Sequence, residues 1–108
     1  MVINVVYNKP HFDKALEEAA SNLVVVEFTA HWCNASASSL KKVADLAAAN
    51  PTVAFIKVDA EKNSEISNLY KVNSLPTFLF LKDGVQVDRM DYSLPSELEQ
   101  KVKKHKPV

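Results

Sequence analysis

The chain has 108 residues, of which 47% are hydrophobic and 24% charged, so it can form one folded domain with a substantial core. Its 13 basic and 13 acidic residues give a net charge of zero, which argues against nucleic acid or an anionic membrane as a partner. No segment approaches the roughly 20 apolar residues of a membrane span, and the first residues lack the pattern of a secretion signal.

The first part of the chain predicts a strand, a helix and a second strand. Residues 2–6 are a short β-branched run, and Asn8-Lys9-Pro10 ends it because proline suits the first turn of a helix. That helix is expected to continue to about Asn22, with a buried side made of Phe12, Leu16 and either Ala19 or Ala20. Residues 23–28 form an apolar run that only Glu27 interrupts, which is typical of a strand covered on both faces.

The middle of the chain predicts two further helices around a third strand. A helix should follow Cys33 and end at Asn50-Pro51, and its apolar residues recur with a helical period at Leu40, Val43, Ala44 and Ala47. Residues 53–58 predict the strand. Asn63 can then cap a short helix, whose inner side would carry Ile66, Leu69 and Tyr70.

The last third predicts a hairpin and a final helix. Residues 77–81 and 85–90 flank Asp83-Gly84, which strongly favours a two-residue turn between antiparallel strands. Ser93 can cap the last helix, which has Pro95 in its first turn. Its inner face is expected to be Leu94, Leu98 and Val102, and its lysine-rich end, residues 101–106, to be solvated.

The predicted order of elements is therefore β-α-β-α-β-α-β-β-α. Helical crossovers favour parallel pairing of the early strands, and the hairpin adds an antiparallel edge. We expect an α/β fold with a mixed five-stranded sheet and helices on both faces. Neither a repeat nor an internal linker divides the chain, so residues 1–108 are expected to form a single domain.

Cys33 is the residue that points most directly to chemistry. It lies between a predicted buried strand and the start of a helix, where backbone amides and the helix dipole favour the thiolate over the thiol. Since the thiolate is the nucleophile, we expect Cys33 to be reactive; the alternative is a buried, inert cysteine. Ser36, three residues further on, can donate a hydrogen bond to the sulfur, and the aromatic Trp32 is a natural contact for a partner.

The remaining composition excludes several kinds of site. One cysteine cannot form a disulfide scaffold and fits a reducing compartment, so we expect a cytoplasmic protein, with the nucleus as a further location. The lone glycine, Gly84, excludes glycine-rich phosphate-binding loops. No grouping of His, Cys and Asp has the spacing of zinc ligands, so no metal site is expected.

These motifs together resemble the thioredoxin family. The resemblance covers essentially the whole chain and rests on Trp32-Cys33 after a buried strand, Glu27 six residues before Cys33, Leu75-Pro76-Thr77, and Gly84 in the hairpin. More narrowly, four segments are similar to the N-terminal thioredoxin domain of multidomain monothiol glutaredoxins, the PICOT-like proteins: Ala60-Glu61, Glu65-Ile66-Ser67, Leu75-Pro76-Thr77-Phe78 and Val87-Asp88-Arg89-Met90-Asp91.

The resemblance implies a thioredoxin fold with four helices and a role for three further residues. Pro76 would be the family's cis-proline, leaving the backbone of Leu75 free to pair with an extended substrate. Glu27, whose pKa should rise on burial, would assist proton transfer at the sulfur. The alternative for Glu27 is a hydrogen bond to a buried water or to a lysine such as Lys57.

Departures from the family pattern are equally informative. Ser36 stands where a dithiol thioredoxin has its second cysteine, and a serine hydroxyl cannot resolve a mixed disulfide. What remains is monothiol chemistry, in which Cys33 forms a mixed disulfide with glutathione or a protein and an external thiol releases it. Asn34-Ala35 replaces the common Gly-Pro, Lys41 replaces a proline, and Tyr92 replaces a glycine where its bulk could narrow the substrate groove.

Two functions are therefore open: a monothiol oxidoreductase, and an interaction module that keeps the fold and docks through Trp32, Cys33 and Pro76. The resemblance implies no cofactor in this domain, with glutathione as a co-substrate and an iron-sulfur cluster only in a separate glutaredoxin domain. It also implies that the 108 residues are a domain excised from a longer protein, with residues 103–108 leading into a linker and BolA-like proteins as partners of the whole. The domain is expected to be a monomer, linked through Cys33 into a dimer under oxidising conditions.

Overall fold

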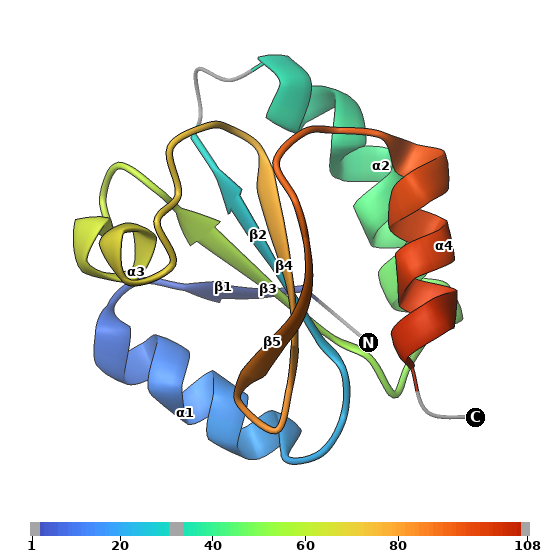
Figure 1. The fold of residues 1–108 in the computed structure, drawn as a ribbon, viewed down its shortest axis with the longest axis horizontal. Helices are drawn as coiled ribbons and strands as arrows, with labels where there is room; N and C mark the ends of the chain where they lie inside the picture. The colour runs from blue at the N-terminus through green and yellow to red at the C-terminus, as the bar shows by residue number, and fades with distance from the viewer. Residues whose placement is uncertain (1–2, 31–33, 107–108) are drawn as a thin grey trace.

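The predicted order of strands and helices is confirmed in the structure, a computed structural model that describes residues 3–30 and 34–106. Figure 1 shows the elements along the chain. They are β1 (Asn4–Val6), α1 (Lys9–Ala19), β2 (Val24–Thr29), α2 (Asn34–Ala49), β3 (Ala54–Asp59), α3 (Ser64–Leu69), β4 (Thr77–Lys82), β5 (Val85–Met90) and α4 (Pro95–His105).

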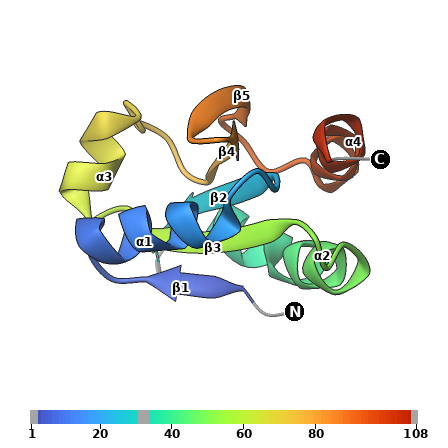
Figure 2. The same ribbon diagram turned by 90° about the horizontal axis from the view of Figure 1, so that it is seen from below.

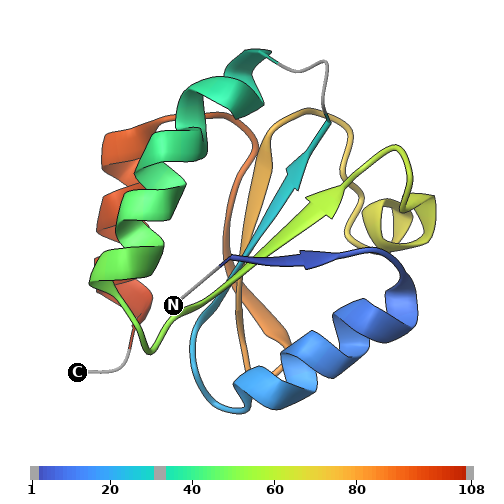
Figure 3. The same cartoon turned by 180° about the vertical axis from the view of Figure 1, so that it is seen from behind.

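The strands form the mixed five-stranded sheet that the sequence predicts, in the order β1-β3-β2-β4-β5. β3 runs parallel to both β1 and β2, whereas β4 is antiparallel to β2 and to β5. Figure 3, the view from behind, shows β1 at one edge beside β3. All six residues of β2, the central strand, are buried, which confirms a strand covered on both faces.

Helices cover both faces of the sheet, with α1 and α3 on one side and α2 and α4 on the other (Figure 2). Alternating side chains of β2 divide between the two layers. Val24, Val26 and Phe28 pack in the first core with Phe12 of α1 and Ile66 of α3. Leu23, just before the strand, and Val25 pack in the second core, to which α2 and α4 contribute Val43, Leu46, Ala47, Leu98 and Val102.

The ends of α1 and the β4–β5 turn follow from local chemistry. The Asn8 side chain accepts a hydrogen bond from the His11 amide at 2.8 Å, which caps the start of α1. The helix ends at Ala19, earlier than predicted, because Ala20 turns the chain with a φ of 52°; Ala19 is the buried one of the pair. Asp83 and Gly84 both have positive φ, as the predicted tight hairpin turn requires.

Several predicted inner faces are rotated in the structure. In α2, Val43 and Ala47 are buried as expected, but Leu40 and Ala44 are exposed and Leu46 takes their place. The same error occurs at Leu69 of α3 and at Leu94, both of which are exposed. A helical period defines an apolar stripe roughly 100° or more wide on the helix surface. Which residues within or beside this stripe are buried depends on how the helix packs against its neighbours.

The two predicted caps differ in outcome. Asn63 occupies the cap position of α3 as predicted, but its side chain donates to the carbonyl oxygen of Asp59 at 2.9 Å and makes no capping hydrogen bond. Leu94, not Ser93, occupies the cap position of α4, without a side-chain hydrogen bond. Both helices therefore begin without the side-chain cap that their sequences suggest.

The end of α4 is partly solvated. Residues 103–105 belong to the helix, and Lys103 and Lys104 are exposed as the sequence predicts, whereas Lys101 and His105 are half-buried. Lys106 Nζ donates to Asn50 Oδ1 at 2.7 Å, which ties this end of α4 to the end of α2. Over residues 3–30 and 34–106, no helix has both the length and the apolar character needed to cross a membrane.

Candidate functional site

The segment that carries Cys33 joins β2 to α2. β2 ends at Thr29 and α2 begins at Asn34, so the predicted change from strand to helix is confirmed on both sides of the segment. Trp32 and Cys33 themselves lie outside the described residues, as does His31. Ser36 belongs to the first turn of α2. Their proposed roles at the sulfur stay predictions.

The Leu75–Pro76 peptide lies at the end of the sheet from which the Cys33 segment leaves β2. It is cis, as the family resemblance implies. Thr77, the next residue, is paired with Phe28 in the antiparallel β2–β4 ladder, so this peptide lies beside the end of β2 from which the Cys33 segment departs. Pro76 is buried and Leu75 is half-buried. Within the described residues, neither the amide nor the carbonyl of Leu75 has a hydrogen-bond partner.

Glu27 is buried in the central strand, with 3% of its surface exposed, as the sequence predicts. In the ladder it pairs with Lys57 on one side and with Phe78 on the other. The parallel register therefore places Lys57 next to Glu27, as the alternative of a hydrogen bond between Glu27 and a lysine requires. Its role in proton transfer stays a prediction.

Asp88 of β5 anchors α4, a role that the sequence did not indicate. Its Oδ1 accepts from Lys101 Nζ at 2.9 Å and from the Arg89 amide at 2.8 Å, and its Oδ2 lies 2.8 Å from His105 Nε2. Burial by itself would raise the pKa of Asp88. The hydrogen bonds from Lys101, His105 and the amide outweigh it and hold that pKa well below its usual range.

We expect Asp88→Asn to lower the free energy of unfolding by about 1–2 kcal/mol near neutral pH, because the charge-assisted hydrogen bonds are lost. A carboxylate with a lowered folded-state pKa stabilises the protein above its unfolded pKa of about 3.9. That stability begins to be lost as the pH falls below about 4 and is gone only below the folded-state pKa, so the difference between the two proteins should be smaller at about pH 3 than at about pH 7. Urea unfolding at about pH 7 and about pH 3 measures both. An equal difference at the two pH values would contradict the assignment.

On the opposite side of β5, Arg89 and Asp91 contact the segment of residues 70–77. Arg89 donates from its two terminal nitrogens to the carbonyl oxygens of Tyr70 (2.6 Å) and Lys71 (3.0 Å), and from Nε to Asp91 Oδ1 (2.8 Å). The Thr77 hydroxyl lies 3.2 Å from the same Asp91 oxygen. Sequence reasoning missed this cluster, although these residues belong to the segment 87–91 that it singled out.

Tyr92 is about half exposed. Its hydroxyl donates to Glu97 Oε2 in the first turn of α4, and this hydrogen bond raises the pKa of Tyr92. The carbonyl oxygen of Asp91, the residue before Tyr92, accepts a hydrogen bond from Ser74 Oγ. Tyr92 therefore directly follows a residue that contacts the segment carrying Leu75 and Pro76. The prediction that its bulk narrows a substrate groove stays open.

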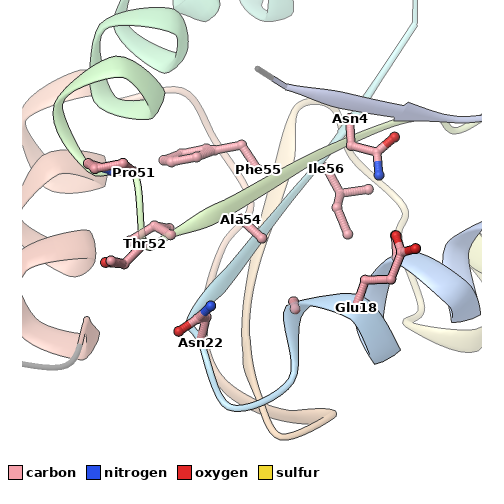
Figure 4. Close-up of a pocket in the computed structure, with 11 residues that line it drawn as sticks. Asn4, Glu18, Asn22, Pro51, Thr52, Ala54, Phe55 and Ile56 are labelled. Carbon is pink, nitrogen blue, oxygen red and sulfur yellow. The ribbon is translucent and has the colours of Figure 1, made fainter. Parts of the chain in front are cut away.

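A pocket lies at the other end of the sheet (Figure 4). It is lined by residues near the starts of β1 and β3 and by the end of α1, including Asn4, Glu18, Asn22 and Ala54. Glu18 is the only charged residue among those that line it. Since the Cys33 segment follows the opposite end of β2, this pocket is not part of the thiol site. Among the described residues, no three acidic or histidine side chains gather as metal ligands.

Both the sequence and the fold of the chain are similar to those of known proteins. The Thioredoxin family profile matches residues 3–104. The chain is 36% identical over 106 residues to a thioredoxin of Geodia cydonium, covering 97% of this chain and 100% of that protein. It is 39% identical over 94 residues to Glutaredoxin-3 of Homo sapiens, covering 87% of this chain and 28% of that protein. The fold matches the X-ray structure of Fasciola hepatica thioredoxin with a TM-score of 0.93, at 36% identity, over 96% of this chain and 100% of that one.

Proposed function

Since the chain belongs to the thioredoxin family, we propose that its redox function runs through a single nucleophile, the thiol of Cys33. One observation carries the proposal. The chain leaves β2 at Thr29 beside the cis Leu75–Pro76 peptide and enters α2 at Asn34, and the only cysteine of the sequence is the residue before that helix. A thiol at such a position is favoured as the reactive thiolate.

The proposed reaction is two successive thiol–disulfide exchanges at Cys33, followed by a third that does not involve the protein. The Cys33 thiolate attacks one sulfur of a substrate disulfide; the old S–S bond breaks, a mixed disulfide with Cys33 forms, and the other half leaves as a thiolate that takes up a proton. A thiolate of the glutathione class then attacks the substrate sulfur of the mixed disulfide, which frees Cys33 and leaves the substrate half in a disulfide with glutathione. A second glutathione-type thiolate exchanges with that disulfide, so that the substrate ends as two thiols and the glutathione-type pair is oxidised to its disulfide.

Ser36 supports the monothiol form of this reaction. A serine hydroxyl is essentially un-ionised at neutral pH and cannot act as the resolving nucleophile, so the second exchange must use an external thiol. The likeness to Glutaredoxin-3, of which the chain spans 28% of the length, agrees with a domain of a monothiol glutaredoxin. The likeness to whole thioredoxins such as that of Geodia cydonium agrees equally with a thioredoxin and with the thioredoxin domain of a glutaredoxin.

A second candidate is a module that docks a partner without turnover. The absence of a second cysteine from the sequence favours it, because a thioredoxin fold without a resolving thiol has lost the dithiol cycle. The same edge, with Leu75 and Pro76, would then serve binding alone.

Alkylation of Cys33 across a range of pH tests the proposal. We expect an apparent thiol pKa clearly below the value of about 8.5 for a free cysteine. Reaction with oxidised glutathione should add one glutathione to the protein, detected as an increase in mass. Cys33→Ser is the control and should take up neither label. A thiol with an ordinary pKa that forms no glutathione adduct would leave only the docking function.

A further inference from the structure

We propose that Arg89 and Asp91 are positioning residues that hold residues 70–77 in the shape that presents the Leu75 backbone to an extended peptide disulfide. This inference rests on the proposed thiol exchange at Cys33. The segment 87–91 would then contribute to substrate selectivity. Only an extended substrate pairs with the Leu75 backbone, whose conformation this segment supports.

Arg89 holds the beginning of residues 70–77. It is the only arginine of the sequence. Each of its three guanidinium nitrogens donates to one acceptor at 2.6–3.0 Å: the carbonyl oxygens of Tyr70 and Lys71 and the carboxylate of Asp91. Tyr70 follows the last residue of α3 and Lys71 has a φ of 55°, so the chain turns sharply there. The carbonyl groups of Tyr70 and Lys71 point beyond the helix, and the guanidinium group donates charge-assisted hydrogen bonds to both.

Asp91 holds the end of the same segment. Its carbonyl oxygen accepts from Ser74 Oγ at 3.3 Å, and its Oδ1 lies 3.2 Å from the Thr77 hydroxyl, whose shorter hydrogen bond, at 2.8 Å, goes to the Ser74 carbonyl oxygen. The Arg89–Asp91 ion pair, at 2.8 Å, joins the two attachments into one cluster. The only residues between Ser74 and Thr77 are Leu75 and Pro76, so the cluster brackets the cis peptide on both sides.

The contacts of Arg89 and Asp91 with residues 70–77 matter for a substrate that pairs as an extended strand with the Leu75 backbone. The amide and carbonyl of Leu75 have no partner within the described residues and can pair with the main chain of a peptide. Such pairing is strongest when the edge is already in the bound conformation, since ordering it on binding costs affinity. A small disulfide makes no main-chain pairing and should not need the bracket.

The test compares a peptide disulfide with a small one. A peptide whose central cysteine carries a thionitrobenzoate group is attacked at that cysteine by the Cys33 thiolate, which forms a mixed disulfide and releases coloured thionitrobenzoate. The small substrate is 5,5′-dithiobis(2-nitrobenzoate). We expect Arg89→Met and Arg89→Lys to lower the peptide rate constant about tenfold and to change the small-substrate rate constant less than about twofold. Arg89→Lys is informative because lysine keeps the charge and loses the three-way donor geometry.

Asp88→Asn is the matched control. Asp88 neighbours Arg89 on β5 and accepts from its backbone amide, but its other side-chain contacts are with Lys101 and His105 of α4 and none is with residues 70–77. It should destabilise the fold and leave the peptide rate constant unchanged. A wild-type peptide rate in Arg89→Lys, or an equal fall with both substrates, would overturn the proposal.

Hydrogen exchange separates this proposal from the proposed function. If the wild-type thiol reacts with neither substrate, the proposed function fails. The backbone amides of residues 70–77 are then compared in wild type and in Arg89→Lys. Exchange about tenfold faster in the variant supports the positioning of the segment, and unchanged exchange overturns it.

Discussion

Replacing Ser36 with cysteine is expected to let the protein close an intramolecular disulfide and reduce insulin repeatedly. Position 36 lies in the first turn of α2, three residues after Cys33, so the change creates a Cys-x-x-Cys sequence at the start of a helix. The introduced thiolate then attacks the mixed disulfide, which releases the substrate and leaves a disulfide between Cys33 and the introduced cysteine that dithiothreitol reduces. The initial rate of insulin precipitation should exceed that of wild type at least about tenfold.

The double variant Cys33→Ser/Ser36→Cys is the first control and should be as slow as the uncatalysed reaction. Ser38→Cys is the second, because it adds a thiol to the same helix at a spacing that does not form the Cys-x-x-Cys sequence. Insulin reduction by Ser36→Cys at the wild-type rate would show that the lack of a resolving thiol does not limit this protein. It would then favour the docking function.

Replacing Phe80 with alanine should cause the largest loss of stability, about 3–5 kcal/mol. Phe80 is completely buried in β4, a strand with neighbours on both sides, and it packs in the core beneath α2 and α4. Its ring also lies 6.2 Å from that of His105, so it supports the anchored end of α4. The loss is large compared with the roughly 5–15 kcal/mol that stabilises a typical domain. Urea unfolding would show it as a lower midpoint with a similar slope.

Val85→Ala is a suitable comparison in the same hairpin. Val85 is 62% exposed, so its truncation should change the free energy of unfolding by no more than about 0.5 kcal/mol. A loss below about 1 kcal/mol for Phe80→Ala would mean that the core collapses around the missing ring, contrary to the tight packing of protein interiors.

The thiol site was predicted in part from the sequence and in part only from the family resemblance. Glu27 was expected to be buried because it interrupts an apolar run, and this is confirmed. The cis conformation before Pro76 came from the resemblance, since no local pattern distinguishes it. Arg89 could have been suspected, as the only arginine of a segment already singled out, but its partners could not.

The missed contacts share one property, which is their separation along the chain. Arg89 reaches Tyr70 across 19 residues, His105 reaches Asp88 across 17, and Lys106 reaches Asn50 across 56. The composition of a lysine-rich helix end describes a solvated segment equally well. Only the position of α4 against β5 and α2 distinguishes an anchored end from a free one.

The order of the elements, the burial of β2 and the hairpin at Asp83-Gly84 were predictable from the amino-acid sequence, because they depend on residue period and turn chemistry within a few positions. The rotation of each helix depends on the packing of the whole fold, which buries Leu46 and leaves Leu40 exposed. The same packing also decided that Arg89 and Asp91 bracket the Leu75–Pro76 peptide. The physical reason is that side-chain partners are selected by packing between distant segments, and local periodicity carries no information about which segments meet.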